Sequence, residues 1–177
     1  LSEDVSPNWH VVPSPLLQRH NINLLILPWP LEVFPAHFRA TRTQNGFGYF
    51  SYAPAPGLSM GSFEQRVEKL MDKGCDRVGP IDGVILPELA LGQEELKIIR
   101  RCVFKRHAFL VAGVRDRFDE DTKKLVATNS WVFEAPLGAG TVIQIQQEKH
   151  HRWRLDRRQI VQYGLGGQLD PCLYWWE

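Results

Sequence analysis

Short apolar runs that end at a proline recur in the first half of the chain. Residues 22–27 form one such run, which stops at Pro28, and residues 83–86 form another, which stops at Pro87. Apolar runs of this length, bounded by turn-forming residues, are typical of buried strands that leave a sheet. We therefore expect buried strands at 22–27 and 83–86.

Two segments repeat their apolar residues with the period of an amphipathic helix. In the first, Ser62 and Gln65 have the spacing of a capping box, and Gly74 is a typical helix stop. The second covers residues 94–106 and predicts a second helix. The apolar positions expected to face inward are Phe63, Val67, Leu70, Met71, Leu96, Ile99 and Val103.

The remaining pattern adds strands and one long loop. Residues 108–114 predict a further strand, and residues 130–133 and 141–147 flank a glycine-containing turn and predict a hairpin. The alternation of strands and helices followed by a hairpin is typical of an α/β layered protein. Residues 28–61 contain five prolines and no sustained period, so we expect a long loop there.

Composition narrows the class of protein. The chain has 177 residues, of which 44% are hydrophobic, enough for one substantial core. Its net charge of +1 argues against a globally basic nucleic-acid binder. The longest early apolar run is too short to span a bilayer, so no membrane partner is expected. Three cysteines without a CxxC pair favour a reducing, cytoplasmic compartment and no disulfide framework; they are Cys75, Cys102 and Cys172.

Two charged residues stand just after predicted strands. Glu88 follows the strand that ends at Pro87, and Lys149 follows the strand at 141–147. In open α/β sheets the ligand crevice lies outside the carboxyl ends of the strands, so these two side chains could converge there. A carboxylate beside an ammonium can act as a general base next to an oxyanion stabiliser. The alternatives are a structural ion pair or two unrelated surface charges.

These residues resemble the nitrilase superfamily, the carbon–nitrogen hydrolases. The segment Asp82-Gly83-Val84-Ile85-Leu86-Pro87-Glu88 is similar to the strand-Pro-Glu motif in which the glutamate is the general base. The hairpin containing Asn129-Ser130-Trp131-Val132-Phe133 and then Lys149-His150-His151 follow in the family's order, and the similarity extends over residues 22–151. The resemblance implies an α-β-β-α sandwich, with residues 1–21 as an extension or linker and 22–177 as a partial nitrilase-like domain.

The resemblance also implies a Glu-Lys-Cys triad that hydrolyses a nitrile or amide. Glu88 would take the proton of a cysteine thiol, and Lys149 would stabilise the negative charge of the tetrahedral intermediate. The family's cysteine follows an apolar strand, whereas Cys172 follows a turn. We therefore expect the nucleophile outside the given chain, which would then be incomplete on its C-terminal side, and Cys172 is the lesser alternative. Cys75 and Cys102 are expected to be buried structural thiols.

The segment after Lys149 departs from the family. Family members continue with an apolar segment carrying another glutamate that positions the triad, and here Asp156 could replace it, with His151 as a second supporting residue. Residues 149–158 are instead rich in basic side chains. They could recognise an anionic substrate or a phosphate, or form a solvated helix face with Trp153 packed inward. No metal site is expected, because the histidines lack ligand spacing, and no cofactor is expected.

Two functions follow as expectations. The first is a hydrolase of nonpeptide carbon–nitrogen bonds acting on a small nitrile or amide. The second is a catalytically inactive nitrilase-like module for assembly or regulation in a larger multidomain protein, such as one fused to a reverse transcriptase in phage defence. Family members often pair, so a homo-oligomer and additional domains of the same polypeptide are the expected partners; nucleic acid is not expected to bind this domain.

Overall fold

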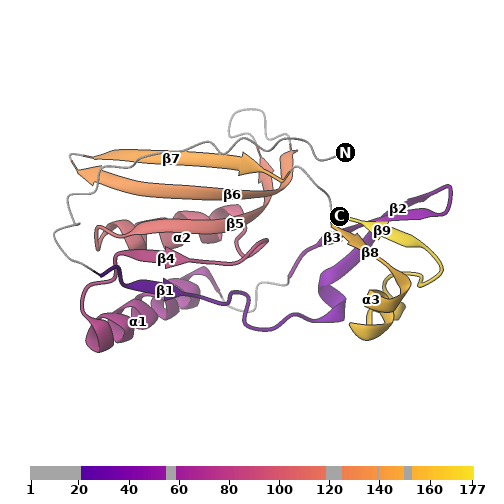
Figure 1. The fold of residues 1–177 in the computed structure, drawn as a ribbon, viewed down its shortest axis with the longest axis horizontal. Coiled ribbons are helices and arrows are strands. Elements are labelled where there is room, and N and C mark those ends of the chain that lie inside the picture. Colours follow the sequence, from indigo (N-terminus) through magenta and orange to yellow (C-terminus); the bar gives the residue numbers. More distant parts are fainter. Residues whose placement is uncertain (1–20, 55–58, 119–124, 139, 150–152) are drawn as a thin grey trace.

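The computed structural model describes residues 21–54, 59–118, 125–138, 140–149 and 153–177. Within these residues the protein is a mixed α/β protein with two mixed sheets and three α-helices. The four-stranded sheet lies beside one end of the five-stranded sheet, not on its face (Figure 1). None of the helices in the described ranges is long and apolar enough to cross a membrane.

The five-stranded sheet has the order β1-β4-β5-β6-β7. Strands β1, β4 and β5 run parallel, and β5, β6 and β7 run antiparallel. The bounds of these strands are Leu24–Ile26, Gly83–Ile85, Phe109–Phe118, Leu125–Gly138 and Thr141–Glu148. The strands expected at 22–27, 83–86 and 108–114 and the hairpin are therefore confirmed, although β5 and both hairpin strands are longer than predicted.

The expected burial of the first strand is wrong. The outward side chains of β1 are exposed, with Leu24 at 45% and Ile26 at 69%. The reason is that β1 lies at the edge of the sheet and only one of its faces meets the helices, where Leu25 packs against the core. An apolar run alone does not distinguish an edge strand from a central one.

The expected loop at 28–61 contains most of the second sheet. Residues 38–44 and 47–52 form β2 (Phe38–Gln44) and β3 (Phe47–Tyr52), which pair as a hairpin. The turn between them is Asn45-Gly46, whose positive φ angles of 48° and 81° suit a two-residue hairpin turn. A short 3-10 helix, η1, at Pro35–His37 precedes β2.

Elements after Lys149 complete the four-stranded sheet, whose order is β2-β3-β9-β8. Their bounds are Arg154–Leu155 for β8, Arg157–Gln162 for α3, Leu165–Gly167 for the 3-10 helix η2 and Tyr174–Trp176 for β9. Strand β9 runs parallel to β3 and antiparallel to β8. A second core forms around Phe38, Leu155, Ile160 and Trp175, and Trp153 packs against it.

Both expected helices are present, with corrected ends. Helix α1 covers Met60–Val78, and its N-cap is Ser59, whose hydroxyl accepts a hydrogen bond from the Ser62 N–H over 3.2 Å. The helix also continues through Gly74 and ends at Gly79, where φ is 82°. Helix α2 covers Gln93–Phe104. Of the predicted inward positions Leu70 alone is exposed, at 37%.

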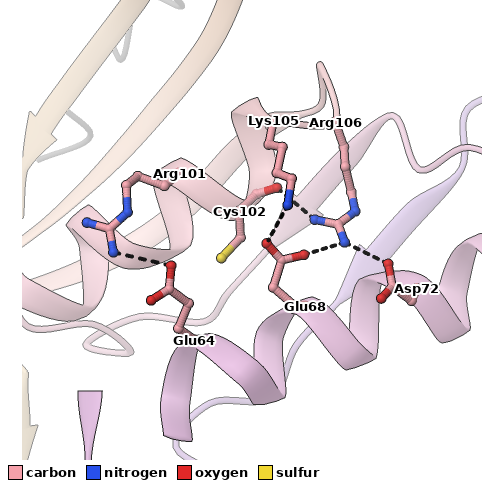
Figure 2. A network of polar contacts seen from close by, with 7 residues as sticks. All are labelled: Glu64, Glu68, Asp72, Arg101, Cys102, Lys105 and Arg106. Atoms are coloured by element: carbon pink, nitrogen blue, oxygen red, sulfur yellow. Dashed lines mark hydrogen bonds and ion pairs between the residues drawn. The ribbon is translucent and has the colours of Figure 1, made fainter. Parts of the chain in front are cut away.

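Charged side chains join the two helices on their outer surface (Figure 2). Glu68 of α1 pairs with Arg106, which also reaches Asp72 over 2.6 Å. Further along, Arg101 lies 3.3 Å from Glu64. The Cys102 thiol lies beneath these pairs, and burial together with the nearby carboxylates raises its pKa to about 11. Cys102 is therefore a protonated, buried thiol at neutral pH, as expected for a structural residue.

Candidate active site

Glu88 stands on the turn that follows β4, at the carboxyl end of the parallel strands. The turn is held against β5, because the Gly113 N–H donates to the Pro87 carbonyl over 3.1 Å and the Leu91 N–H donates to the Gly113 carbonyl over 3.1 Å. The approach is so close that a Cβ at Gly113 would lie 2.5 Å from the Glu88 Cα. The glycine on β5 thus fixes where the Glu88 backbone sits.

Lys149 follows β7, which is separated from β4 by two strands, β5 and β6, and its side chain contacts Glu88. Its N–H donates to the Asn129 carbonyl over 3.0 Å, which fixes the residue beside β6. The Lys149 Nζ then lies 2.7 Å from the Glu88 Oε1. The structure therefore brings together the two residues that the sequence placed at strand ends.

Asn129 and Glu177 complete the cluster, and neither was among the predicted site residues. The Asn129 side-chain amide, on β6, donates to Glu88 Oε1 and to Glu177 Oε1, both over 2.8 Å. The Lys149 ammonium donates to Glu177 Oε2 over 2.8 Å. Glu177 is also the more enclosed carboxylate: its side chain is 5% exposed, against 59% for Glu88.

Glu177 lies at the site because it directly follows β9, a strand of the second sheet. Strand β9 pairs with β3 and β8, and the Glu177 N–H donates to the Trp153 carbonyl over 2.9 Å. One sequence signal was present: Glu177 directly follows the apolar residues 173–176, as Glu88 follows an apolar strand. Asn129 carried no comparable signal, because an amide within a strand is an ordinary residue.

The charges in the cluster stabilise one another. Partial burial raises the pKa of Glu88, but hydrogen bonds from Lys149 and Asn129 and the charge of Lys149 outweigh it, so the pKa lies below its usual value. Burial lowers the pKa of Lys149, but hydrogen bonds to Glu177 and Glu88 and their charges outweigh it, so the net direction is upward. At neutral pH the site therefore holds an ionised carboxylate beside a protonated ammonium.

Asp116 adds a further carboxyl group near the cluster. Burial raises its pKa, the charge of Arg115 opposes that rise, and the charge of Glu177 adds to it. Its backbone has a φ of 46°, a region that residues with side chains rarely adopt. Among the residues that the structure describes, no group of three or more His, Cys, Asp or Glu side chains is arranged to hold a metal ion.

A pocket of about 490 Å³ opens beside Glu88 and Lys149. Its lining is mixed, with the polar residues Asn129 and Gln147 and the apolar residues Val111 and Trp131. An ionised carboxylate, an ammonium and an amide at the edge of such a pocket can accept a proton and stabilise negative charge that develops on a bound molecule.

The cysteines of the printed sequence lie elsewhere. All three are within the described residues, and none of them lines the pocket beside Glu88 and Lys149. Cys75 and Cys102 are on α1 and α2, in the helix layer. Cys172 is exposed before β9, and its N–H donates to Asp170 over 2.8 Å.

Of the two predicted supporting residues, the structure describes Asp156 only, and it has another role. Asp156 caps α3, since its carboxylate accepts a hydrogen bond from the Gln159 N–H over 2.9 Å. Within the described residues, the carboxylates that pair with the Lys149 ammonium are those of Glu88 and Glu177. His151 lies outside the described residues. In the basic segment Trp153 is partly buried against the second core, whereas Arg157 and Arg158 are exposed on α3.

Comparison of this chain with protein-family models, with curated proteins and with solved structures found no match. The structure itself defines a mixed α/β protein. A Glu–Lys–Glu cluster lies at the edge of its larger sheet where β4 and β7 end.

Proposed function

We propose that this chain carries the carboxylate and ammonium part of a carbon–nitrogen hydrolase site of the nitrilase type. The observation that supports the proposal is the 2.7 Å contact between Glu88 and Lys149, two residues that each follow a strand of the same sheet. The larger sheet with α1 and α2 supplies one helix layer and one sheet layer of the proposed α-β-β-α arrangement.

In the proposed reaction Glu88 acts as the general base. It takes the proton of a cysteine thiol while the sulfur attacks the amide carbon, and the carbonyl electrons move to the oxygen. Lys149 stabilises that oxyanion. The C–N bond then breaks, the departing amine takes the proton from Glu88, and a thioester remains. Water attacks the thioester, Glu88 accepts its proton, and the carboxylic acid leaves as the thiol is restored.

Glu177 and Asn129 are positioning residues in this proposal. Glu177 accepts a hydrogen bond from the Lys149 ammonium, and the Asn129 amide bridges the Glu88 and Glu177 carboxylates. The lowered pKa of Glu88 keeps the base ionised at neutral pH, and the raised pKa of Lys149 keeps the oxyanion partner charged. The thiol of the proposal comes from outside the printed sequence, since none of its three cysteines lines the pocket.

The same cysteine positions favour a second candidate function, a nitrilase-like module without catalysis. In that case the cluster is a structural junction, in which Lys149 ties the turn after β4 to the end of β9. Such a module would act in assembly or regulation within a larger protein. The two functions differ in one observable property, the release of ammonia or an amine.

The test measures ammonia and amine release from a panel of nitriles and amides by the full-length protein. We expect release by the wild type and a loss of at least about a hundredfold in Glu88→Gln and in Lys149→Met, because each removes a group that acts in the transition state. Absence of release from every compound would contradict the hydrolase and support the structural module.

Matched controls come from an ion pair on the exposed surface of α2. Glu94 and Lys97 also form a contact of 2.8 Å, with side chains 69% and 51% exposed. Glu94→Gln and Lys97→Met repeat the same chemical changes away from the pocket, so both should leave the rate unchanged. Equal losses in these controls and in the site variants would overturn the roles given to Glu88 and Lys149.

A further inference from the structure

The two faces of the four-stranded sheet differ in exposure. Side chains on one face form the second core, where Phe50 is 3% exposed and Trp175 is 2% exposed. Helix α3 packs against this buried face through Ile160 (Figure 1). The side chains that alternate with the core residues along each strand point the other way. On that exposed face Phe47 is 46% exposed and Tyr174 is 49% exposed.

Arginine and aromatic side chains form a row across the exposed face. The strand registers place Arg42 opposite Tyr49 and Tyr49 beside Trp176. Arg154 stands opposite Trp176 at the other end of the row, which spans four strands, roughly 14 Å. The Arg42 guanidinium lies 4.1 Å from the centroid of the Tyr49 ring, and that of Arg154 lies 5.8 Å from the centroid of Trp176. Both arginines are therefore held over aromatic rings.

Two further rings and a third arginine extend this surface. Phe47 and Tyr174 are neighbours in the register, and their ring centroids lie 6.4 Å apart. The Arg154 guanidinium also lies 5.2 Å from the centroid of the Tyr174 ring. Arg39, opposite Ser51, adds positive charge on β2. The exposed face thus combines arginines with a continuous set of aromatic rings.

The charge of this face differs from that of the whole chain. Strands β2, β3, β8 and β9 contain no aspartate or glutamate. Within the described residues, Arg39, Arg42 and Arg154 form no ion pair with a carboxylate. The net charge of +1, from which we expected no nucleic-acid partner, averages over this local excess of positive charge. Clustered basic side chains on one face are the electrostatic signature of polyanion binding.

We propose that the exposed face of the four-stranded sheet binds single-stranded nucleic acid. Unpaired bases stack on aromatic rings, and arginines bind the phosphates between them. A four-stranded sheet can hold two or three bases in this way. An acidic peptide would pair with the arginines but give the rings nothing to stack on, and an apolar surface would bury the arginines without partners. A duplex keeps its bases stacked on one another, so it does not offer them to the rings.

The experiment is fluorescence anisotropy of the full-length protein with labelled DNA and RNA strands of about ten nucleotides, and with a DNA duplex of the same length. We expect at least one of the two single strands to bind more tightly than the duplex. Tyr174→Ala should weaken that binding by about fivefold or more, because it removes a ring on which a base stacks. Arg42→Gln and Arg154→Gln should each lower the slope of log affinity against log salt by about one, because each removes a phosphate contact.

Matched controls lie on the other side of the same sheet. Tyr163 is 50% exposed at the end of α3, against 49% for Tyr174, and Arg157 is exposed on the same helix. Tyr163→Ala and Arg157→Gln should bind like the wild type, and circular dichroism verifies that every variant is folded. The proposal is overturned if neither single strand binds at low salt, if the duplex binds as tightly as the single strands, or if Tyr163→Ala and Tyr174→Ala lose the same affinity.

Discussion

The Glu177 carboxylate lies 2.8 Å from the Lys149 ammonium, although the two residues belong to different sheets. Lys149 follows β7 of the larger sheet, and Glu177 follows β9 of the smaller one. The contact therefore ties the two sheets together at the candidate site. Since the Glu177 side chain is nearly inaccessible to solvent, this contact should matter more for stability than the exposed contact from Glu88.

Glu177→Gln should lower the free energy of unfolding by about 1–3 kcal/mol, because it removes the charge from an enclosed, doubly hydrogen-bonded carboxylate. Glu88→Gln should cost less than about 1 kcal/mol, because that side chain is mostly in solvent. Urea denaturation of both variants measures the difference. A larger loss of unfolding free energy in Glu88→Gln than in Glu177→Gln would contradict the conclusion that the more buried carboxylate contributes more to stability.

The stability contributed by Glu88 should depend on pH in a defined direction. Its pKa is lowered from 4.5 in the folded state, so its contribution is present above pH 4.5 and is lost as pH falls through the lower folded value. The difference in unfolding free energy between wild type and Glu88→Gln should therefore shrink below pH 4.5. A difference that stays constant from pH 7 into the acid range would show that the ion pair does not form.

Lys149 should have the opposite dependence. Its pKa is raised from 10.5, so its contribution is complete below pH 10.5 and is lost as pH rises through the higher folded value. Denaturation of wild type and Lys149→Met between pH 8 and the alkaline limit of folding checks this, with Lys97→Met as the exposed control. The unfolding free energies of the wild type and Lys149→Met should differ at pH 8 and converge as Lys149 loses its proton.

Gly113→Ala should destabilise the protein and displace the turn that carries Glu88. The added Cβ would lie 2.4 Å from the Pro87 carbonyl oxygen and 2.6 Å from the Leu89 nitrogen, closer than any real contact, and backbone must move to admit it. We expect a loss of about 2–4 kcal/mol, typical of overpacking with backbone shifts. Gly166→Ala is the control, since nothing lies within 4 Å of its Cβ. Thermal denaturation in which the two variants behave alike would contradict the close approach.

Arg100→Leu should be among the most destabilising changes outside the site. Arg100 holds Glu134, which is 1% exposed, through two hydrogen bonds of 2.6 and 2.5 Å. Removing the guanidinium leaves a buried charge without compensation, at a cost of about 3–5 kcal/mol. The double variant Arg100→Leu/Glu134→Leu should recover most of that loss in chemical denaturation. A single variant as stable as the wild type would refute the role of the pair.

The sequence predicted those parts of the molecule whose signals are local. Glu88 and Lys149 were found because each follows the end of a predicted strand, and parallel strands of one sheet bring such ends together. The hairpin of β2 and β3 also had a local signal, the hairpin-turn dipeptide Asn45-Gly46, but the prolines in the segment favoured a loop. Ser59 capped α1 in place of Ser62, since two serines three residues apart both suit that position.

Other features depend on contacts between distant residues and could not be predicted from local pattern. Glu177 reaches Lys149 only because β9 pairs with β3, which places Phe47 opposite Tyr174. The exposure of β1 depends on its place at the sheet edge, which the order of strands determines. Asp156 was a reasonable substitute carboxylate by composition, but the start of α3 uses it as a cap.

The most direct test of the central claim is the intact mass of the full-length protein, measured after rapid quenching during reaction with an amide or nitrile substrate. The account predicts a mass increase equal to the acyl group on a cysteine thiol, formed by the wild type and by Glu94→Gln but not by Glu88→Gln or Lys149→Met. An adduct that forms equally in Glu88→Gln, or no adduct with any substrate that the protein hydrolyses, would contradict the account.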